Sequence, residues 1–241
     1  MPRDHHVGRA LALQRDPSLP PSLERTEGLC PILRPDVPMR IRLERHEPPL
    51  PVCPGGVCSV RRFFEEAARD GAEVELDVGA GYGRFARGHA AAHPEIRLLA
   101  IEQEEARIAR MDVAARRQGL TNVAFLNAQA RYVLEYCVPP GSVSAAHLLF
   151  PDPWPKDRHA RNRLFRRPNV DLFHRLLRTG GVLHAATDNG PYFEQMLEVM
   201  RGDGRFEPVP PPVRPPDEQT DFERKFIEQG KTVLAASWRK V

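Results

Sequence analysis

The chain has 241 residues, of which 41% are hydrophobic, and its formal net charge is +3. This length and apolar content suit one substantial α/β domain with extensions. No apolar run approaches the roughly 18 residues that a membrane helix needs, and no apolar segment follows the polar amino terminus as it would in a signal peptide. The composition therefore excludes a membrane-spanning protein and favours a soluble, cytoplasmic one.

Residues 1–58 differ in character from the rest of the chain. They contain 11 of the 25 prolines and show little periodicity apart from a short run at 39–43. We expect a proline-rich, irregular amino-terminal extension that is ordered only by packing on the main domain. The folded domain is predicted to occupy residues 59–241.

The four cysteines give no sign of a metal or redox site. No Cys-x-x-Cys spacing occurs among Cys30, Cys53, Cys58 and Cys137. We expect unpaired thiols, with a Cys53–Cys58 bond as the alternative under oxidising conditions. No metal is predicted for this protein.

Strand and helix patterns alternate from residue 59 onward, which is typical of a mostly parallel sheet with helices on both faces. An amphipathic helix comes first and ends near Gly71, because apolar residues recur at helical spacing through Arg69. Apolar runs predict strands at 74–78, 97–101, 123–127, 143–150, 182–187 and 232–238. Periodic segments predict further helices at 84–93, 104–118, 131–136, 169–178 and 189–200.

Turn residues predict how some of these elements begin and end. Gly180 and Gly181 are expected to terminate the helix at 169–178. Asp188 or Asn189 is expected to cap the helix that follows, with Pro191 in its first turn. A proline-rich connector at 208–216 would then lead to the closing strand.

A glycine-rich segment ends the first predicted strand of the sheet. Gly79, Gly81 and Gly83 follow Asp77 in the order Asp-Val-Gly-Ala-Gly-Tyr-Gly, which permits a sharp turn and close approach of a ligand. The dinucleotide fingerprint is not met, because its third glycine comes one residue early. Asp77 would repel a pyrophosphate but suits S-adenosylmethionine, which carries an ammonium, a sulfonium and no phosphate. A tight strand–helix turn without a ligand is the alternative.

The next two strands end in polar residues at the same edge of the sheet. Glu102 ends the second strand, where a carboxylate can accept hydrogen bonds from both hydroxyls of a ribose. The third strand ends in Asn127-Ala128-Gln129, which offers amides to an adenine edge. Together with Asp77, these residues predict a nucleoside-binding site.

The segment Phe-Pro-Asp-Pro-Trp-Pro-Lys at 150–156 follows a buried strand. Each proline biases the residue before it toward extended backbone, so Phe150, Asp152 and Trp154 are expected to lie outside the helical basin on a stiff loop. Asp152 then lies just past the carboxyl end of a strand, where open α/β sheets bind ligands. Trp154 would stack on a substrate base or pack into the domain.

A basic segment begins at the end of this loop. From Lys156 to Arg178, eight Lys and Arg residues face two Asp residues, a local balance of +6. A solvated helix face is one interpretation. Next to an acidic and aromatic loop, we favour a surface that binds RNA phosphates.

Taken together, these residues resemble the tRNA (guanine-N7-)-methyltransferase family of class I S-adenosylmethionine-dependent methyltransferases. The motifs that carry the resemblance are 150–156 with Arg158-His159, Ala186-Thr187-Asp188 with Tyr192, and Thr-Asp-Phe-Glu-Arg-Lys-Phe at 220–226. The resemblance extends roughly over 59–239. It implies a Rossmann-like fold with a seven-stranded sheet and methyl transfer to N7 of guanine 46 in the variable loop of tRNA.

The resemblance also implies roles for individual residues. The cofactor-binding residues would be Asp77, Gly79, Gly81, Gly83, Glu102, Gln129 and Asp152, and Asp152 would also be the catalytic acid. The substrate-binding residues would be Lys156, Asp188, Thr220, Asp221, Phe222 and Glu223. For Asp188 a helix cap is an equal alternative, and for 220–223 a surface turn. The expected partner is tRNA, with no obligate protein partner, and the protein is expected to be a monomer or homodimer.

The chain departs from the family pattern in three places. Gln129 stands where Asp or Asn is common, Asp221 stands where Lys is frequent, and the extension lacks an arginine-rich segment. Arg40, Arg42 and Arg45 could partly replace that segment. The lost lysine at position 221 and the lost basic segment would weaken tRNA binding without abolishing the chemistry. The alternatives are a methyltransferase of the same fold with another acceptor and a non-catalytic RNA-binding relative.

Overall fold

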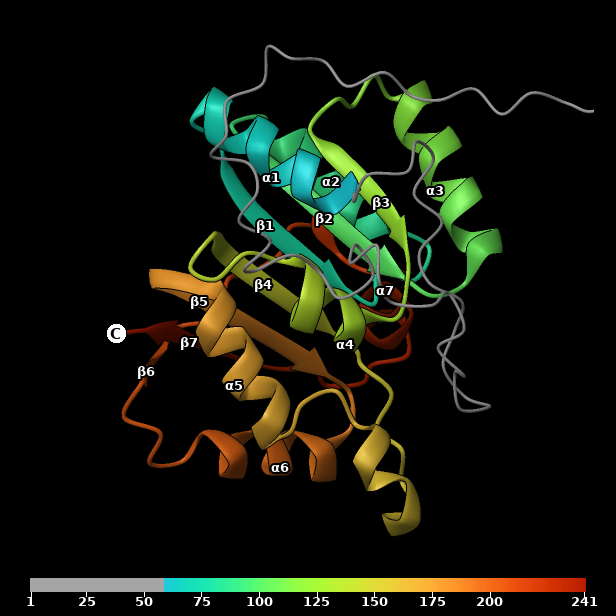
Figure 1. The fold of residues 1–241 in the computed structure, drawn as a ribbon. Helices are drawn as coiled ribbons and strands as arrows, with labels where there is room; N and C mark the ends of the chain where they lie inside the picture. Colours follow the sequence, from blue (N-terminus) through green and yellow to red (C-terminus); the bar gives the residue numbers. More distant parts are fainter. Residues whose placement is uncertain (1–58) are drawn as a thin grey trace, which may run out of the picture. The chain divides into compact units, whose positions relative to one another are not determined.

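A computed structural model describes residues 59–241 of the chain. The predicted extension, its run at 39–43, the arginines at 40, 42 and 45, and Cys30, Cys53 and Cys58 lie outside the described residues. The described part forms a seven-stranded sheet in the order β3-β2-β1-β4-β5-β7-β6 (Figure 1). The strands are parallel from β3 to β5, whereas β7 runs antiparallel to both β5 and β6. This architecture confirms the predicted fold class.

The elements follow the predicted alternation. The strands are β1 (Glu73–Val78), β2 (Ile96–Glu102), β3 (Val123–Asn127), β4 (Val143–Leu149), β5 (Leu177–Thr187), β6 (Phe206–Val209) and β7 (Leu234–Lys240). The α-helices are α1 (Ser59–Asp70), α2 (Arg84–Ala92), α3 (Glu105–Arg117), α4 (Ala130–Tyr132), α5 (Arg167–Leu176), α6 (Gly190–Met200) and α7 (Asp221–Glu228). A π-helix, η3 (Val133–Cys137), and two 3-10 helices, η4 (Asp157–Asn162) and η5 (Pro216–Glu218), complete the set.

The core has a large apolar cluster on one face of the sheet and smaller ones on the other. Side chains from α1, α5 and α6 join Leu76 and its neighbours in the large cluster. On the opposite face, Ala86 of α2 packs on β2, while Phe85 packs against Leu149 and Ala186. The alternation along β1 explains this division, because Leu76 points to one face and Glu75 and Asp77 point to the other.

Four details differ from the prediction. Gly180 and Gly181 do not end a helix but lie inside β5, because α5 already ends at Leu176 and the chain continues directly into the strand. The short strand β6 was not predicted, since it contains Pro208. It pairs only with β7 at the edge of the sheet, where proline is tolerated. The helix α7 was also missed, and most of the helix predicted at 131–136 is the π-helix η3.

The last glycine of the loop provides a test of the packing at the start of α2. Gly83 has φ +68, and a Cβ there would lie 2.3 Å from Met111 Sδ. Gly119 has φ +70, but a Cβ there would meet no described atom within 4 Å. We expect Gly119→Ala to cost about 1 kcal/mol of unfolding free energy from backbone strain alone. Gly83→Ala should cost about 3 kcal/mol because overpacking is added.

Urea unfolding of the two variants beside the wild type measures both losses. Equal losses would show that Met111 moves aside freely and would contradict the packing argument.

Candidate active site

The carboxyl ends of β1, β2, β3 and β4 open into one cleft with a volume of about 680 Å³. Most of the site residues predicted from the sequence line it, namely Asp77, Gly79, Gly81, Glu102, Gln129, Asp152, Thr220, Asp221 and Phe222. Four predicted residues do not line it: Gly83, Lys156, Asp188 and Glu223. Predicted cofactor-binding residues and predicted substrate-binding residues, from segments far apart in the sequence, thus line the same cleft.

The glycine-rich loop leaves open space above its backbone. The amides of Gly79 and Ala80 both donate to the carbonyl oxygen of Ile101, at 2.9 and 3.0 Å, which joins the loop to the end of β2. Gly79 and Gly81 have φ +87 and +58, and a Cβ on either would meet no described atom within 4 Å. A ligand can therefore approach this backbone closely.

Asp77 lies at the base of the cleft with only 3% of its surface exposed. Its Oδ2 atom has no hydrogen-bond partner among the described residues. Burial raises the pKa of this carboxyl to about 7, the charge of Glu102 adds to the increase, and His89 opposes it. A buried carboxylate without a partner is costly, so this atom is positioned to receive a cationic ligand group.

Glu102 organises the backbone around it. Its Oε2 accepts a hydrogen bond from the Gly81 amide at 2.9 Å, and its Oε1 accepts from the amides of Gln103 and Glu104 at 2.9 and 3.0 Å. A carboxylate offers about four lone-pair positions, of which the amides use three, and Arg107 Nη1 lies 3.5 Å from Oε2. The structure therefore leaves room for about one ribose hydroxyl on Glu102, whereas the sequence analysis assigned it two.

The loop at 150–156 is stiff, but not in the way expected from its prolines. Phe150 and Trp154 have φ of 54 and 42, in the left-handed region and not in the extended region that was predicted. The amide of Phe150 donates to Ala186 O at 2.7 Å. Arg163 donates to Pro153 O at 2.8 Å and to Trp154 O at 3.0 Å. These bonds hold a strained backbone in place beside the cleft.

The structure divides the basic segment into two groups. Four of its eight cations are used in internal contacts, including Arg163 and Arg167, which lies 3.1 Å from Asp203. Arg175 donates to two carbonyls, and Arg178 pairs with Glu73. The other four are Lys156, Arg158, Arg161 and Arg166, of which Arg158 donates to the neighbouring ring of His159 at 3.3 Å. Of these, Arg161 and Arg166 line the cleft, and Lys156 and Arg158 are exposed nearby along the chain.

The start of α7 forms another wall of the cleft. Thr220 caps this helix, because its Oγ1 accepts from the Glu223 amide at 2.9 Å. The carboxylate of Glu223 accepts two hydrogen bonds of 2.9 Å from Arg214, and both side chains are buried. Phe222 lies 6.5 Å from Phe150, ring centre to ring centre. The segment therefore presents Thr220, Asp221 and Phe222 to the cleft, while Glu223 faces inward.

Asp188 directly follows the end of β5. The cap of α6 is Asn189, whose Oδ1 accepts from the Tyr192 amide at 2.9 Å. The Asp188 carboxylate lies 3.7 Å from Lys231 Nζ. The capping alternative for Asp188 is therefore wrong, and its substrate role stays a prediction.

The cleft also contains residues that the sequence analysis did not single out. Asn162 and Asn169 line it near the basic side chains, and Arg84 and Tyr82 line it beside the glycine loop. The charge pattern pointed to Arg161 and Arg166. Nothing in the pattern distinguished Asn169, whose amide donates to Leu164 O at 2.7 Å.

Known proteins with similar sequences establish the family. Residues 72–236 match a protein-family model described as "Putative methyltransferase". The tRNA (guanine-N(7)-)-methyltransferase of Halorhodospira halophila is 34% identical over 214 residues, covering 86% of this chain and 84% of that protein. This chain belongs to the tRNA (guanine-N7-)-methyltransferase family.

Two further comparisons agree with this assignment. The family member from Pseudomonas aeruginosa is 36% identical over 175 residues, covering 69% of this chain and 70% of that protein. Among solved structures, the 16S rRNA methyltransferase KamB shares the fold, with a TM-score of 0.55 at 18% identity over 74% of this chain and 93% of that chain. None of the helices in residues 59–241 is long and apolar enough to cross a membrane.

The family uses S-adenosylmethionine, and the cleft fits this cofactor on two observations. The unpartnered oxygen of Asp77 offers a carboxylate to a cationic group. The open backbone at Gly79 and Gly81 offers the space that a bound nucleoside needs. Both observations agree with the cofactor predicted from the sequence.

The raised pKa of Asp77 makes a prediction about cofactor affinity. With a pKa of about 7, this carboxyl is mostly protonated at pH 5.5 and half ionised at pH 7. The ammonium of S-adenosylmethionine stays protonated over this range, because α-amino groups have pKa values of about 7.7–8. Since the cation prefers the ionised carboxylate, affinity should rise about tenfold from pH 5.5 to 7.

Isothermal titration at several pH values measures this change. Asp77→Asn, which cannot ionise, should bind more weakly and with little pH dependence. A wild-type affinity that is flat over the same range would contradict the assigned contact.

Proposed function

We propose that this protein transfers a methyl group from S-adenosylmethionine to N7 of a guanine in tRNA, at guanine 46 of the variable loop. The observation that carries the proposal is the shared cleft. It joins the acidic glycine loop to the loop of Asp152 and to the cations Arg161 and Arg166. A cofactor site and a phosphate-binding surface thus open into the same space.

The chemistry requires alignment more than proton transfer. Guanine N7 has an in-plane lone pair and no proton, so its attack on the methyl group needs no general base. S-adenosylmethionine supplies the electrophilic methyl group on a sulfonium. The protein must hold N7, the methyl carbon and the sulfur in line and stabilise the positive charge that moves to the base.

Asp152 is proposed as the residue that orients and stabilises the guanine. Its side chain is exposed and lines the cleft just beyond the carboxyl end of β4. From there its carboxylate would accept hydrogen bonds from the N1 and N2 edge of the base or favour the cationic product. Asp77, Glu102 and the glycine loop would bind the cofactor, with Gln129 at the adenine edge.

The tRNA would be held by two surfaces. Lys156, Arg158, Arg161 and Arg166 are the four cations of the basic segment that are not used in the internal contacts described above, and they would bind phosphates. Thr220, Asp221 and Phe222 would contact the nucleotide from the opposite segment, with Asp188 next to them. Glu223 would contribute indirectly by fixing the start of α7 through Arg214.

Substrate and cellular location follow together in this proposal. A tRNA substrate favours a cytoplasmic enzyme. For the oligomeric state, we propose a monomer or homodimer. The family's substrate name and the basic cleft wall support the choice of acceptor. A different acceptor or a non-catalytic RNA-binding role is an outcome that the following experiment distinguishes.

Asp152→Asn tests the catalytic assignment. We expect the yield of 7-methylguanosine per unit time to fall about 100-fold, because one stabilising group of the transition state is lost. Affinity for S-adenosylmethionine should change less than twofold. The measurement incubates the enzyme with labelled cofactor and total tRNA, digests the RNA, and identifies the nucleosides by mass spectrometry.

Glu194→Gln on the exposed side of α6 is the matched control and should retain full activity. An equal loss of cofactor affinity in Asp152→Asn would assign Asp152 to cofactor binding instead. Methylation at another base would identify a different acceptor, and cofactor binding without methylation would indicate a non-catalytic relative.

Arg161→Ala tests the phosphate-binding surface. The logarithm of wild-type affinity for tRNA should fall with the logarithm of salt concentration with a slope of about −3. Removing one phosphate contact should reduce this slope by about 1. Arg201, which pairs with Glu198 on α6, provides the control variant Arg201→Ala with an unchanged slope. A flat wild-type response would contradict the proposed surface.

A further inference from the structure

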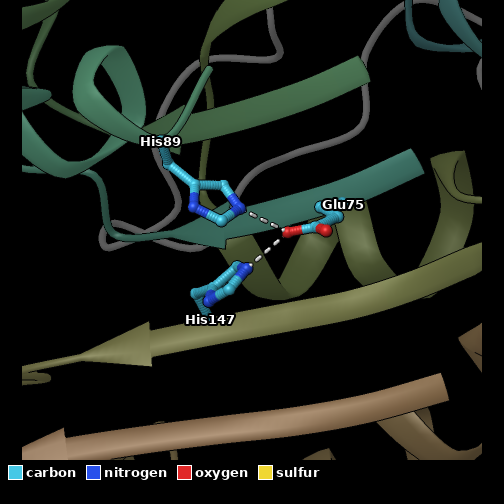
Figure 2. Close-up of side chains that lie close together, drawn as sticks. All are labelled: Glu75, His89 and His147. Carbon is cyan, nitrogen blue, oxygen red and sulfur yellow. Dashed lines mark hydrogen bonds and ion pairs between the residues drawn. The ribbon is translucent and has the colours of Figure 1, made fainter. Parts of the chain in front are cut away.

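A row of polar side chains crosses the face of the sheet beneath α2. Asp77, His147, His184 and Ser237 occupy paired positions on four neighbouring strands, β1, β4, β5 and β7. Glu75 joins the row from β1 and lies between His147 and His89 of α2 (Figure 2). Asp77 belongs to the proposed cofactor site, but the function proposed above uses none of the other side chains in this cluster.

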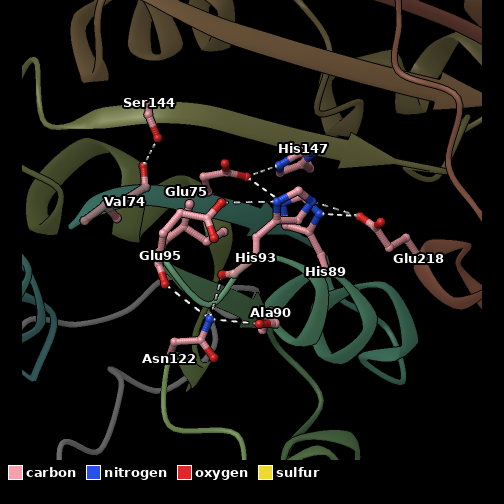
Figure 3. A network of polar contacts seen from close by, with 11 residues as sticks. Val74, Glu75, His89, Ala90, His93, Glu95, Asn122, Ser144, His147 and Glu218 are labelled. Atoms are coloured by element: carbon pink, nitrogen blue, oxygen red, sulfur yellow. Dashed lines mark hydrogen bonds and ion pairs between the residues drawn. The ribbon is translucent and has the colours of Figure 1, made fainter.

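His89 is the centre of the cluster because both of its ring nitrogens face carboxylates. Its Nε2 lies 2.9 Å from Glu75 Oε2, and its Nδ1 lies 2.6 Å from Glu218 Oε2 (Figure 3). All three side chains are only 12–14% exposed. With both carboxylates ionised, both contacts are hydrogen bonds only if both nitrogens carry a proton, so this arrangement favours an imidazolium at His89.

The electrostatics of the cluster agree with this charge. Burial alone would lower the pKa of His89, but hydrogen bonds and charge interactions with Glu75 and Glu218 raise it overall. His147 donates from Nε2 to Glu75 at 2.7 Å, and burial lowers its own pKa, so it remains neutral. One cation therefore lies between two carboxylates in a largely buried site.

Histidine and glutamate are also zinc ligands, but the distances between the ring nitrogens and the Glu75 carboxylate favour hydrogen bonds. Two ligand atoms of a tetrahedral zinc ion, each about 2.0 Å from the metal, are separated by about 3.3 Å. The two nitrogens lie 2.7 and 2.9 Å from the shared oxygen of Glu75. A proton fits between such atoms without any movement, whereas a metal ion would have to push them apart.

Glu218 belongs to η5, which lies directly on α2. A Cβ on Gly88 would be 1.9 Å from the Asp217 carbonyl oxygen, so the two backbones approach as closely as glycine permits. Arg84 also donates to Pro216 O at 3.2 Å. Two residues after Glu218, Thr220 caps α7 and begins the wall of the cleft. The contact of His89 with Glu218 thus joins the helix that follows the cofactor loop to the wall on the tRNA side.

We propose that His89, held as an imidazolium between Glu75 and Glu218, is a positioning residue that fixes η5 and the start of α7 for tRNA binding. The proposal rests on the function proposed above for the cleft. His89 acts through Glu218 and touches neither substrate nor cofactor. Loss of the contact lets Thr220, Asp221 and Phe222 move away from their binding positions.

The charge of His89 gives this contact a defined pH dependence. Because the folded pKa is raised, the stabilisation is complete below the unfolded pKa of about 6.5 and is lost as pH rises through the folded value. The groups that face His89 are Glu75 and Asp77 on β1, His147 on β4, His184 on β5, His93 on α2 and Glu218 on η5. Arg214 adds a constant positive charge that acts on His147 and His184.

Two of these neighbours stay in one form above pH 7.5. Burial lowers the pKa of His184 to about 3 and also lowers that of His147, so both rings are neutral. Asp77, with a pKa raised to about 7 by burial, is mostly ionised above this pH. The tRNA affinity should therefore weaken as pH rises through the folded pKa of His89, and comparison with Glu218→Gln separates this loss from other titrations.

Equilibrium binding of tRNA at saturating cofactor tests the proposal. We expect the wild-type affinity to fall about tenfold as His89 loses its proton. Below the folded pKa of His89, Glu218→Gln and His89→Gln should bind tRNA about tenfold more weakly than the wild type, with little further pH dependence. The double variant should be no weaker than either single one. Glu194→Gln on the exposed side of α6 is the control, because Glu194 lies outside this cluster.

In Glu218→Gln, cofactor affinity and turnover at saturating tRNA should stay within about twofold of the wild-type values. This result would distinguish a positioning role from a general loss of folding. Hydrogen–deuterium exchange, corrected for intrinsic pH effects, should accelerate at 216–222 in this variant, and in the wild type as pH rises through the folded pKa of His89. This readout does not depend on methyl transfer. Faster exchange without 7-methylguanosine formation would reject the proposed function and retain the His89 contact.

Three results would overturn the inference. The first is that tRNA affinity and hydrogen–deuterium exchange at 216–222 change neither with pH nor in Glu218→Gln. Another is faster exchange with unchanged tRNA affinity, which would make the contact purely structural. The third is stoichiometric zinc in the purified protein that is lost in His147→Gln, since the cluster would then hold a metal and not a proton.

Discussion

The hydrogen bonds to the carboxylate of Glu102 are the constraint on which the site depends. This side chain ends β2 and binds three backbone amides, one from the glycine loop and two from its own turn. It therefore fixes the shape of two adjacent crossovers at once. Because parallel strands present their carboxyl ends at one edge, fixing these turns defines the floor of the cleft, and the other loops are arranged around it.

The cleft walls come from segments that need support from elsewhere in the fold. Arg163 stabilises the loop of Asp152 by donating hydrogen bonds to two of its carbonyl oxygens. Arg214 stabilises the start of α7 by donating to the Glu223 carboxylate. Much of the positive charge near the site thus maintains backbone geometry and is not available to RNA. This division explains how a protein with a net charge of only +3 combines an ordered site with a basic surface.

The sequence predicted the parts of the fold that depend on local periodicity. The strands β1 to β5 and the glycine loop were recognised because apolar runs and glycine spacing report directly on buried strands and turns. Nine of the thirteen site residues predicted from the motifs also line the cleft. The sequence could not reveal that Arg163 and Arg214 are internal braces, since their partners are carbonyls and carboxylates brought close only by folding. The clustering of Glu75, His89 and Glu218 was hidden for the same reason.

The left-handed backbone at Phe150 and Trp154 has a consequence for engineering this protein. A residue with a Cβ is strained in this conformation, so relieving the strain at either position would raise the free energy of unfolding. Glycine would relieve the cost but would also free the loop to leave its aligned shape. Selection for heat resistance alone would therefore favour changes that erode activity, and the loop is a point where stability and activity trade against each other.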